Sequence, residues 1–306
     1  MNTLIQYLQY FLNGITLGAI YALIALGYTM VYGILKFINF AHGDILMIGA
    51  YTGLLTYTAL LGESTNAAWM LISFFIAMLL SMAFCAVLGM FIEKVAYKPL
   101  RNANRLAPLL SAIGVSFTLS NGAAWMFGTQ SRRFPYPFDD TPIVIAGLSI
   151  TPHQILTIAV SIIMMIVLTS FVNRTRMGKA MRATSLDQPT SELMGIDVNR
   201  VISMTFAIGS ALAAVGGILA SFDFRVYASM GTMTGLKAFV AAVIGGIGNI
   251  QGAMLGGIIL GILESVGAPL LGTPSALRDT IAFATLIIIL LVKPDGILGK
   301  NEREKV

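Results

Sequence analysis

Residues 68–92 read AWMLISFFIAMLLSMAFCAVLGMFI, a run of 25 residues without a charged side chain. A helix needs about 20 mostly apolar residues to cross the hydrocarbon core of a bilayer. A strand of a membrane barrel would instead alternate polar and apolar residues over about ten positions. The run is apolar on every face, so it predicts a membrane-spanning helix.

The composition extends this conclusion to the whole chain. Hydrophobic residues make up 57% of the 306 positions and charged residues only 11%, with a mean hydropathy of +0.83. Because a soluble domain carries roughly 25% charged residues, part of this surface must face lipid. We expect an all-α, polytopic transmembrane bundle of about eight helices, some broken by glycine, in a single transmembrane domain over residues 1–306.

The apolar runs place these helices along the chain. A segment at 236–271 is interrupted by glycines, and it fits either two crossings that meet near Asn249 or a re-entrant pair. The other helices are predicted at 4–35, 40–61, 68–95, 106–127, 153–172, 201–222 and 280–292.

The basic residues indicate the orientation. Thirteen Lys and Arg residues fall in the loops 94–105 and 174–200 and in the tail 293–306. The loops assigned to the opposite side hold five: Arg132, Arg133, Arg225, Lys237 and Arg278. Cytoplasmic loops carry the excess of Lys and Arg, so the N-terminus should lie outside and the C-terminus in the cytoplasm. The net charge of +5 does not indicate nucleic-acid binding, because the basic residues cluster at helix ends.

Two polar, glycine-containing segments break apolar surroundings: INFAHGD at 38–44 and GGIGNIQG at 245–252. Such interruptions in the two halves of a transporter point to its translocation path. Broken helices expose backbone polar groups, which are tolerated at membrane depth only inside protein or along a wet cavity. The predicted path residues are Asn39, His42, Gly43, Asp44, Gly245, Gly246, Gly248, Asn249 and Gln251.

Three ionisable residues are functional candidates because they fall within apolar segments: His42, Asp44 and Glu264. Each also has a structural interpretation. Asp44 could complement the dipole at the start of a helix, and His42 could lie at the edge of the membrane. Glu264 should face the bundle interior, where it either lines the path or hydrogen-bonds a partner helix.

The loop at 174–200 contains a second kind of candidate. Pro189 favours the start of a helix and Gly195 its end, which predicts a helix of under two turns with apolar points at Leu193 and Met194. A short helix of this kind fits a groove on a partner protein, although it could also lie on the membrane surface. The candidate contact residues are Arg182, Ser191, Glu192, Leu193, Met194 and Gly195.

The same loop resembles a known family. GKAMRA at 178–183 and SELMGIDVNRV at 191–201 are similar to the ATPase-docking loop of type II ABC importer permeases. The loop departs from the family at Gln188-Pro189-Thr190, where a more continuous polar and alanine-rich helix is expected.

Other motifs resemble, more narrowly, the branched-chain amino-acid permease subunit of the LivH type. They are YTMVYGI at 28–34, NFAHGD at 39–44, AAVIGGIGNIQGAMLGG at 241–257 and KPDGILG at 293–299. The resemblance covers nearly the whole chain. It implies half of an import path for leucine, isoleucine and valine in the bacterial inner membrane.

The resemblance also implies the partners: a second related permease, two ABC ATPase subunits and a periplasmic amino-acid-binding protein. The chain has no Gly-x-x-x-x-Gly-Lys-Ser/Thr phosphate-binding loop, and its two His and one Cys suggest no metal site or catalytic nucleophile. We therefore expect no enzymatic activity and no cofactor in this chain, with ATP and Mg²⁺ bound by the partner ATPases.

Two other classes of transporter remain possible from the residues. One is a proton-coupled secondary transporter that uses His42, Asp44 and Glu264. The other is a passive channel for small amides or urea. The resemblance favours the ATP-driven importer over both.

Overall fold

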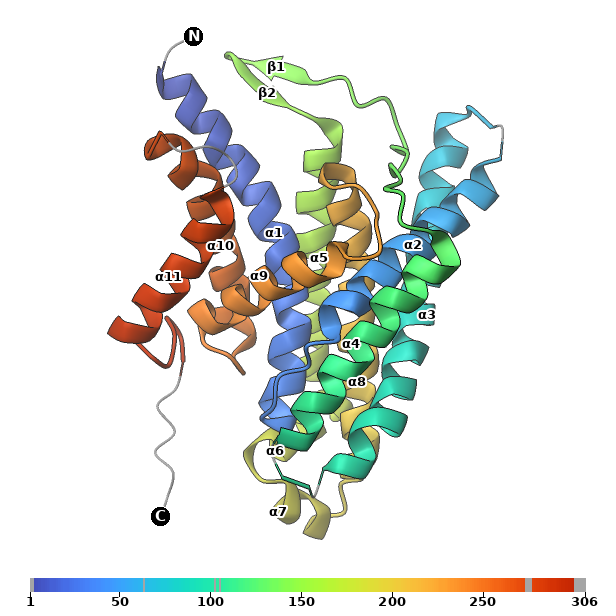
Figure 1. Cartoon of the computed structure of the whole chain (residues 1–306), viewed down its shortest axis with the longest axis vertical. Coiled ribbons are helices and arrows are strands. Elements are labelled where there is room, and N and C mark those ends of the chain that lie inside the picture. The colour runs from blue at the N-terminus through green and yellow to red at the C-terminus, as the bar shows by residue number, and fades with distance from the viewer. Residues whose placement is uncertain (1–2, 63, 102, 105, 273–276, 300–306) are drawn as a thin grey trace.

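The computed structural model describes residues 3–62, 64–101, 103–104, 106–272 and 277–299. These residues form a helical bundle with one small β-hairpin (Figure 1). The elements in chain order are α1 (Thr3–Leu35), α2 (His42–Leu61), α3 (Ala67–Ile92), the π-helix η1 (Glu93–Tyr97), the 3-10 helix η2 (Lys98–Leu100), α4 (Leu106–Phe127), β1 (Ile143–Ile145), β2 (Leu148–Ile150), α5 (Pro152–Arg174), α6 (Arg176–Leu186), α7 (Gln188–Leu193), α8 (Val198–Asp223), α9 (Met230–Gly245), α10 (Ile250–Leu270) and α11 (Arg278–Val292).

The predicted polytopic helical bundle is confirmed. Seven helices in the described part of the chain are long and apolar enough to cross a membrane: α1, α2, α3 with its continuation to Leu100, α4, α5, α8 and α10. The glycine-broken segment forms the short helix α9, of 16 residues, followed by α10, of 21. The helix α9 begins at Met230, six residues before the predicted segment. The prediction placed the start too late because Thr232 and Thr234 interrupt the apolar pattern there.

The two ends of the bundle differ. The β1–β2 hairpin, which pairs Ile143 with Ile150, lies at one end, and α6 and α7 lie at the other (Figure 1). We call these the hairpin end and the α7 end. The hairpin is fixed to α1 by Gln9, which donates to the Ser149 carbonyl oxygen at 2.8 Å and accepts from the Ser149 amide at 2.9 Å.

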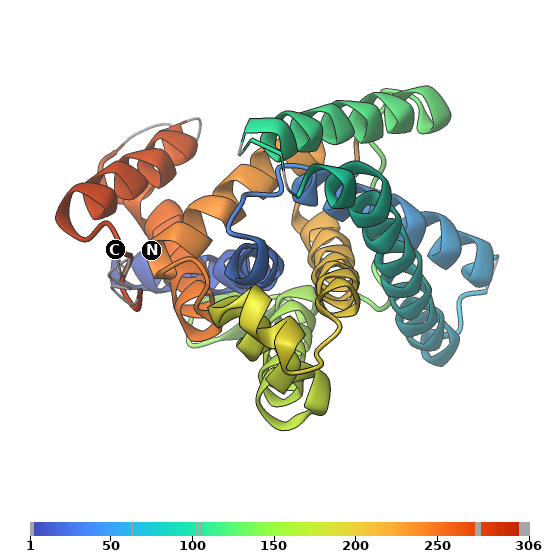
Figure 2. The same cartoon turned by 90° about the horizontal axis from the view of Figure 1, so that it is seen from below.

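The helix α1 forms the centre of the bundle, where it is buried against α8, α9 and α10 (Figure 2). Small residues allow this close packing, as is common between helices in lipid. A Cβ atom added to Gly14 would come within 2.8 Å of the Ile262 Cα, and one added to Gly18 within 2.8 Å of the Ile258 Cα. The helices α1 and α10 therefore touch backbone to backbone.

The peripheral helices α3, α4, α5 and α11 expose large apolar side chains instead. Leu79, Phe117, Ile163 and Leu291 are examples, one from each helix. Figure 2 shows α4 and α11 on the outside of the bundle. Such a surface is suited to lipid or to other membrane helices.

Candidate functional site

The first broken segment lies inside the bundle. Helix α1 ends at Leu35, residues 36–41 run back without regular helix, and α2 begins above the lower end of α1 (Figure 1). The buried Asn39 holds this connection in place, because its Oδ1 accepts from the Ala41 amide at 3.1 Å and from the Tyr97 hydroxyl at 2.6 Å. The break is thereby tied to the π-helix η1.

His42 and Asp44 are both buried in the protein interior. The His42 ring packs edge-on against Tyr28 with ring centroids 4.6 Å apart, and it fills the space beside Gly27, where a Cβ atom would overlap it. The Asp44 carboxyl group lies in the first turn of α2, and its buried Oδ1 has no hydrogen-bond partner in the described part of the chain. Both side chains are thus covered by protein, as a residue of the translocation path or a packed structural residue would be.

Gly43 brings the start of α2 into contact with the start of α9. A Cβ atom on Gly43 would overlap the Gly231 carbonyl oxygen, and one on Gly231 would overlap the Gly43 carbonyl oxygen. A Cβ atom on Gly235 would lie 2.7 Å from the Gly43 Cα. The first break therefore meets residues that the sequence did not single out.

The second break packs against a different part of the chain, the tail after α11. The Ile297 amide donates to the Ile244 carbonyl oxygen at 2.8 Å, and the Leu298 amide to that of Gly245 at 2.9 Å. The Asn249 Nδ2 donates to the Leu298 carbonyl oxygen at 2.8 Å, while its Oδ1 accepts from the first amides of α10. The tail motif and the glycine motif thus form one structural unit.

The glycines of this unit have two structural roles, an unusual backbone conformation and close backbone contact. Gly246 and Gly248 adopt φ angles of +106° and +93°, which few other residues adopt without strain. Gly245 and Gly252 touch each other backbone to backbone, so neither has room for a side chain. Gln251, the remaining polar candidate here, is exposed.

Glu264 lies in a buried ion-pair cluster. The Lys237 Nζ is 2.5 Å from the Glu264 Oε1 and 2.6 Å from the Asp279 Oδ1, and the Tyr21 hydroxyl donates to the Glu264 Oε2 at 3.0 Å. The cluster joins α1, α9, α10 and α11. The sequence-based assignment of Lys237 to an external loop is wrong, because α9 starts at Met230 and carries Lys237 into the bundle.

The predicted short helix of the 174–200 loop is present as α7, Gln188–Leu193. Asp187 caps it by accepting from the Thr190 hydroxyl at 2.6 Å and the Thr190 amide at 3.1 Å. These hydrogen bonds stabilise the carboxylate and lower the pKa of Asp187. Gly195, at a φ angle of +82°, follows the helix and redirects the chain toward α8.

The six candidate residues of this loop divide into two groups. Leu193 and Met194 are 87% and 79% exposed, next to the exposed Glu192 and Gly195. Arg182 instead donates to the Val172 carbonyl oxygen at the end of α5, and the buried Ser191 donates to the Asp187 carbonyl oxygen at 2.7 Å. Four residues therefore present a surface, and two hold the loop together.

Comparison with known proteins identifies the family. The profile described as branched-chain amino acid transport system / permease component matches residues 10–290. The chain belongs to this family.

Full-length relatives within the family carry consistent names. The chain is 43% identical to the high-affinity branched-chain amino acid transport system permease protein BraD of Pseudomonas aeruginosa, over 100% of both chains. It is 44% identical to the LivH permease protein of Escherichia coli, over 99% of this chain and 98% of that one. A probable LivH protein of Methanocaldococcus jannaschii is 29% identical over 90% of this chain. This chain is therefore a multi-pass membrane permease component.

The permease also contains two polar networks that sequence reasoning missed. The buried Glu93 forms an ion pair with Arg101 and accepts from the Ser203 hydroxyl at 2.6 Å, so it joins η1 to α8. At the hairpin end, the His153 ring lies 2.7 Å from the Asp140 Oδ2 and 3.3 Å from the Asp223 Oδ1. Glu93 carried a usable signal, a carboxylate at the end of an apolar run. The partners of His153 are separated from it in sequence, and nothing in the residue pattern indicated that they meet.

Proposed function

We propose that this permease forms half of the translocation path of an ATP-driven importer for the branched-chain amino acids leucine, isoleucine and valine. The observation that carries the proposal is α7, a capped helix whose end exposes Leu193 and Met194 on a protein of the permease family. Exposed apolar residues at a helix end are suited to a groove on a partner. The partner we propose is an ABC ATPase, present in two copies, which binds ATP and Mg²⁺.

The α7 end faces the cytoplasm of a bacterial cell in this proposal. The basic loops 94–105 and 174–200 lie at that end, in agreement with the distribution of Lys and Arg in membrane proteins. Four of the counted basic residues, Arg105, Lys300, Arg303 and Lys305, lie outside the described residues. The hairpin end then faces the periplasm, where a binding protein delivers the amino acid.

Two connections join α7 to the bundle, one to the start of α8 and one to the end of α1. Asp197 caps α8 by accepting from the Arg200 amide at 3.0 Å, and only Ile196 separates it from Gly195, which follows α7. The Gln188 side chain donates to the Ile34 carbonyl oxygen at 2.7 Å, next to the first broken segment. We propose that ATP-driven displacement of α7 shifts the end of α1 and the break that follows it.

The path itself runs past both broken segments in this proposal. Asn39, His42, Gly43 and Asp44 form its deep part with the start of α9, and a second related permease completes the other half. Gly245, Gly246, Gly248, Asn249 and Gln251 shape its cytoplasmic part. Glu264, paired with Lys237, fixes α9 beside the path.

The test is the substitution Leu193→Asp in the complete transporter reconstituted in vesicles. A charge at this exposed apolar point should reduce co-purification of the ATPases and ATP-dependent leucine uptake by tenfold or more, since about 1.4 kcal/mol of lost affinity suffices. Val144→Asp is the matched control, because Val144 is also an exposed apolar residue but lies at the hairpin end. It should retain the ATPases.

Two results would contradict the proposal. One is normal ATPase binding and normal uptake by Leu193→Asp. The other is wild-type uptake that continues without ATP and collapses with a proton uncoupler, which would indicate a secondary transporter.

A further inference from the structure

Two of the peripheral helices, α3 and α5, expose only hydrophobic residues within the bundle. This holds for all of α3 and for the part of α5 between Ile155 and Val172. Polar side chains of these helices point inward, as Ser81 of α3 and Ser161 of α5 do, both of which are fully buried. Because polar groups are unfavourable in hydrocarbon, such an arrangement suits helices that face lipid.

Helix α4 has the reverse arrangement. Gly114, Thr118 and Asn121 are exposed, and spacings of four and three residues place them on one face of the helix. We call these three residues the α4 stripe. The opposite side of α4 buries the apolar residues Ala112 and Ala123 against the bundle. The polar and small side of α4 therefore points away from its own chain.

The α4 stripe has space and a free hydrogen-bond acceptor. A Cβ atom added to Gly114 would lie in open space. The Asn121 Nδ2 donates to the Phe117 carbonyl oxygen at 2.8 Å, but the Asn121 Oδ1 accepts no hydrogen bond from the described residues. Interfaces between membrane helices are rich in small residues and in Thr and Asn side chains that hydrogen-bond across them. The stripe thus indicates contact with another membrane helix instead of lipid.

The short helix α9 is a second feature of the same side of the bundle, where it lies between α4 and α11 (Figures 1 and 2). Its 16 residues extend about 24 Å, less than the roughly 30 Å of the hydrocarbon core. It starts against Gly43 of the first break and ends at Gly245 of the second, and Thr232 and Met233 near its start are exposed. Helix ends at membrane depth must be covered by protein or water, so this side of the bundle needs a cover.

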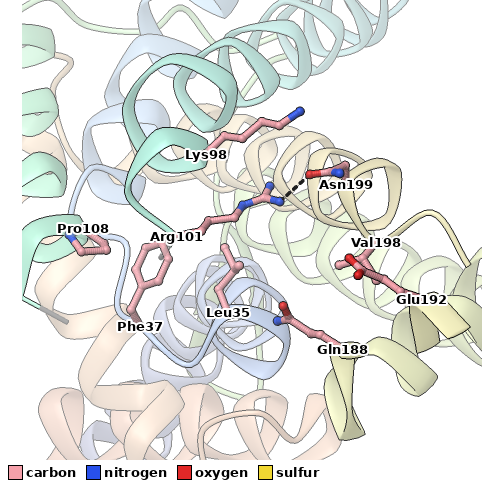
Figure 3. A pocket seen from close by; sticks show the side chains of 9 residues that line it. All are labelled: Leu35, Phe37, Lys98, Arg101, Pro108, Gln188, Glu192, Val198 and Asn199. Atoms are coloured by element: carbon pink, nitrogen blue, oxygen red, sulfur yellow. Dashed lines mark hydrogen bonds between the residues drawn. The ribbon is translucent and has the colours of Figure 1, made fainter. Parts of the chain in front are cut away.

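The start of α4 also lies close to the first break and to α7. A pocket of about 350 Å³ at the α7 end is enclosed by the end of α1, η2, α7 and the starts of α4 and α8 (Figure 3). Pro108 of α4 lines it together with Phe37, which follows α1, and Gln188 of α7. A protein seated on α4 would therefore adjoin both the proposed path and the helix that the ATPase is proposed to move.

We infer that the second permease packs on the α4 stripe and covers the outer side of α9. This inference rests on the proposed function, in which two related permeases share one path. Two related chains that share a path equally are arranged about an approximate two-fold axis, and here the axis would pass beside α9, which joins the two breaks. Gly114 would admit the backbone of a partner helix, and the Asn121 Oδ1 would accept a hydrogen bond from it.

The first experiment replaces Phe117 with the photocrosslinking residue p-benzoylphenylalanine in the complete transporter in membranes. Phe117 lies on α4 beside the stripe and is 65% exposed, so the replacement fits this chain. After irradiation, mass spectrometry should identify the second permease as the main crosslinked protein. The matched control is the same replacement at Phe84 of α3, which is 52% exposed and should crosslink no permease.

Three crosslinking results would overturn the inference. The first is that Phe117 crosslinks only lipid. The second is that it crosslinks a second copy of this chain and not the related permease. The third is that Phe84 crosslinks the second permease as strongly as Phe117 does.

The second experiment fills the stripe with the substitution Gly114→Leu. The purified permease alone should unfold in denaturant as the wild type does, because the added side chain enters open space. In the complete transporter, the amount of second permease that co-purifies should fall at least tenfold, since the partner backbone can no longer approach. Ala83→Leu is the matched control, because it adds bulk at an exposed position of α3 and should retain the second permease. Full retention by Gly114→Leu, or equal losses in the two variants, would contradict the inference.

The wild-type transporter separates this inference from the proposed function. If the purified, ATP-driven transporter contains a second permease that Phe117 does not reach, only the inference fails. If branched-chain amino acids are imported with no second permease present, the shared path of the proposed function fails.

Discussion

Replacement of Lys237 by Met should destabilise the bundle strongly, because it removes the cation from a buried cluster. The Nζ atom lies 2.5 Å from the Glu264 Oε1. At an effective dielectric constant of about 20, that separation corresponds to a Coulomb attraction of roughly 7 kcal/mol. Desolvation of both charges offsets part of it, so the expected loss of unfolding free energy is about 3–5 kcal/mol, the usual cost of leaving a buried charge unpaired.

The cluster supplies its own comparison. The Glu264 side chain is 4% exposed, whereas that of Asp279, bound to the same Nζ at 2.6 Å, is 44% exposed. Solvent screens the second pair, so Asp279→Asn should cost no more than about 1 kcal/mol. Equal losses for Lys237→Met and Asp279→Asn would show that burial does not govern this cluster.

The assay is denaturant unfolding of the permease in mixed micelles, followed by tryptophan fluorescence. The double variant Lys237→Met with Glu264→Gln should recover most of the loss, because it leaves no buried charge and keeps a group that can hydrogen-bond Tyr21. A double-mutant cycle isolates the pairwise term. The reasoning is refuted if the single variant loses less than about 1 kcal/mol or if the two single losses simply add.

Two other predictions concern the first break and α7. Gly43→Ala should lower the free energy of unfolding by about 1–3 kcal/mol in the same assay, since the added methyl group would overlap the Gly231 carbonyl oxygen. Gly114→Ala is the control and should be neutral or stabilising, because there is open space beside Gly114. Equal effects of the two substitutions would refute the close contact. Asp187→Ala should speed amide exchange across α7 by removing its cap. The pKa of Asp187 is lowered in the folded loop, so the stabilisation of α7 by the Asp187 carboxylate is complete at neutral pH and is lost as the pH falls through that lowered pKa. The rate of amide exchange in α7, relative to the rest of the chain, should therefore rise in acid in the wild type but not in Asp187→Ala.

Much of the architecture followed from local properties of the sequence. A run such as 68–92 must satisfy its backbone hydrogen bonds internally once it is in lipid, so hydropathy alone predicted the spanning helix α3. The boundaries of α7 were equally local, because Pro189 suits the first turn of a helix and Gly195 its termination. Hydropathy and capping act within a few residues, and one sequence displays them.

The pairing of distant segments was not predictable in the same way. Lys237 was assigned to a loop because the polar start of α9 hides the helix, and its two carboxylate partners come from α10 and α11. The meeting of Gly43 with Gly231 likewise joins two distant parts of the chain. Neither residue type nor spacing specifies such a partner.

The sequence by itself determined that this chain is a bundle of membrane helices with a short helix exposed in one loop, because length, hydropathy and capping are local properties. Only the tertiary structure decided which charges are paired, which glycines touch, and that η2, α7 and the end of α1 enclose a pocket. Those features depend on the crossing of helices far apart in the chain. The crossings are set by the packing of all their side chains together.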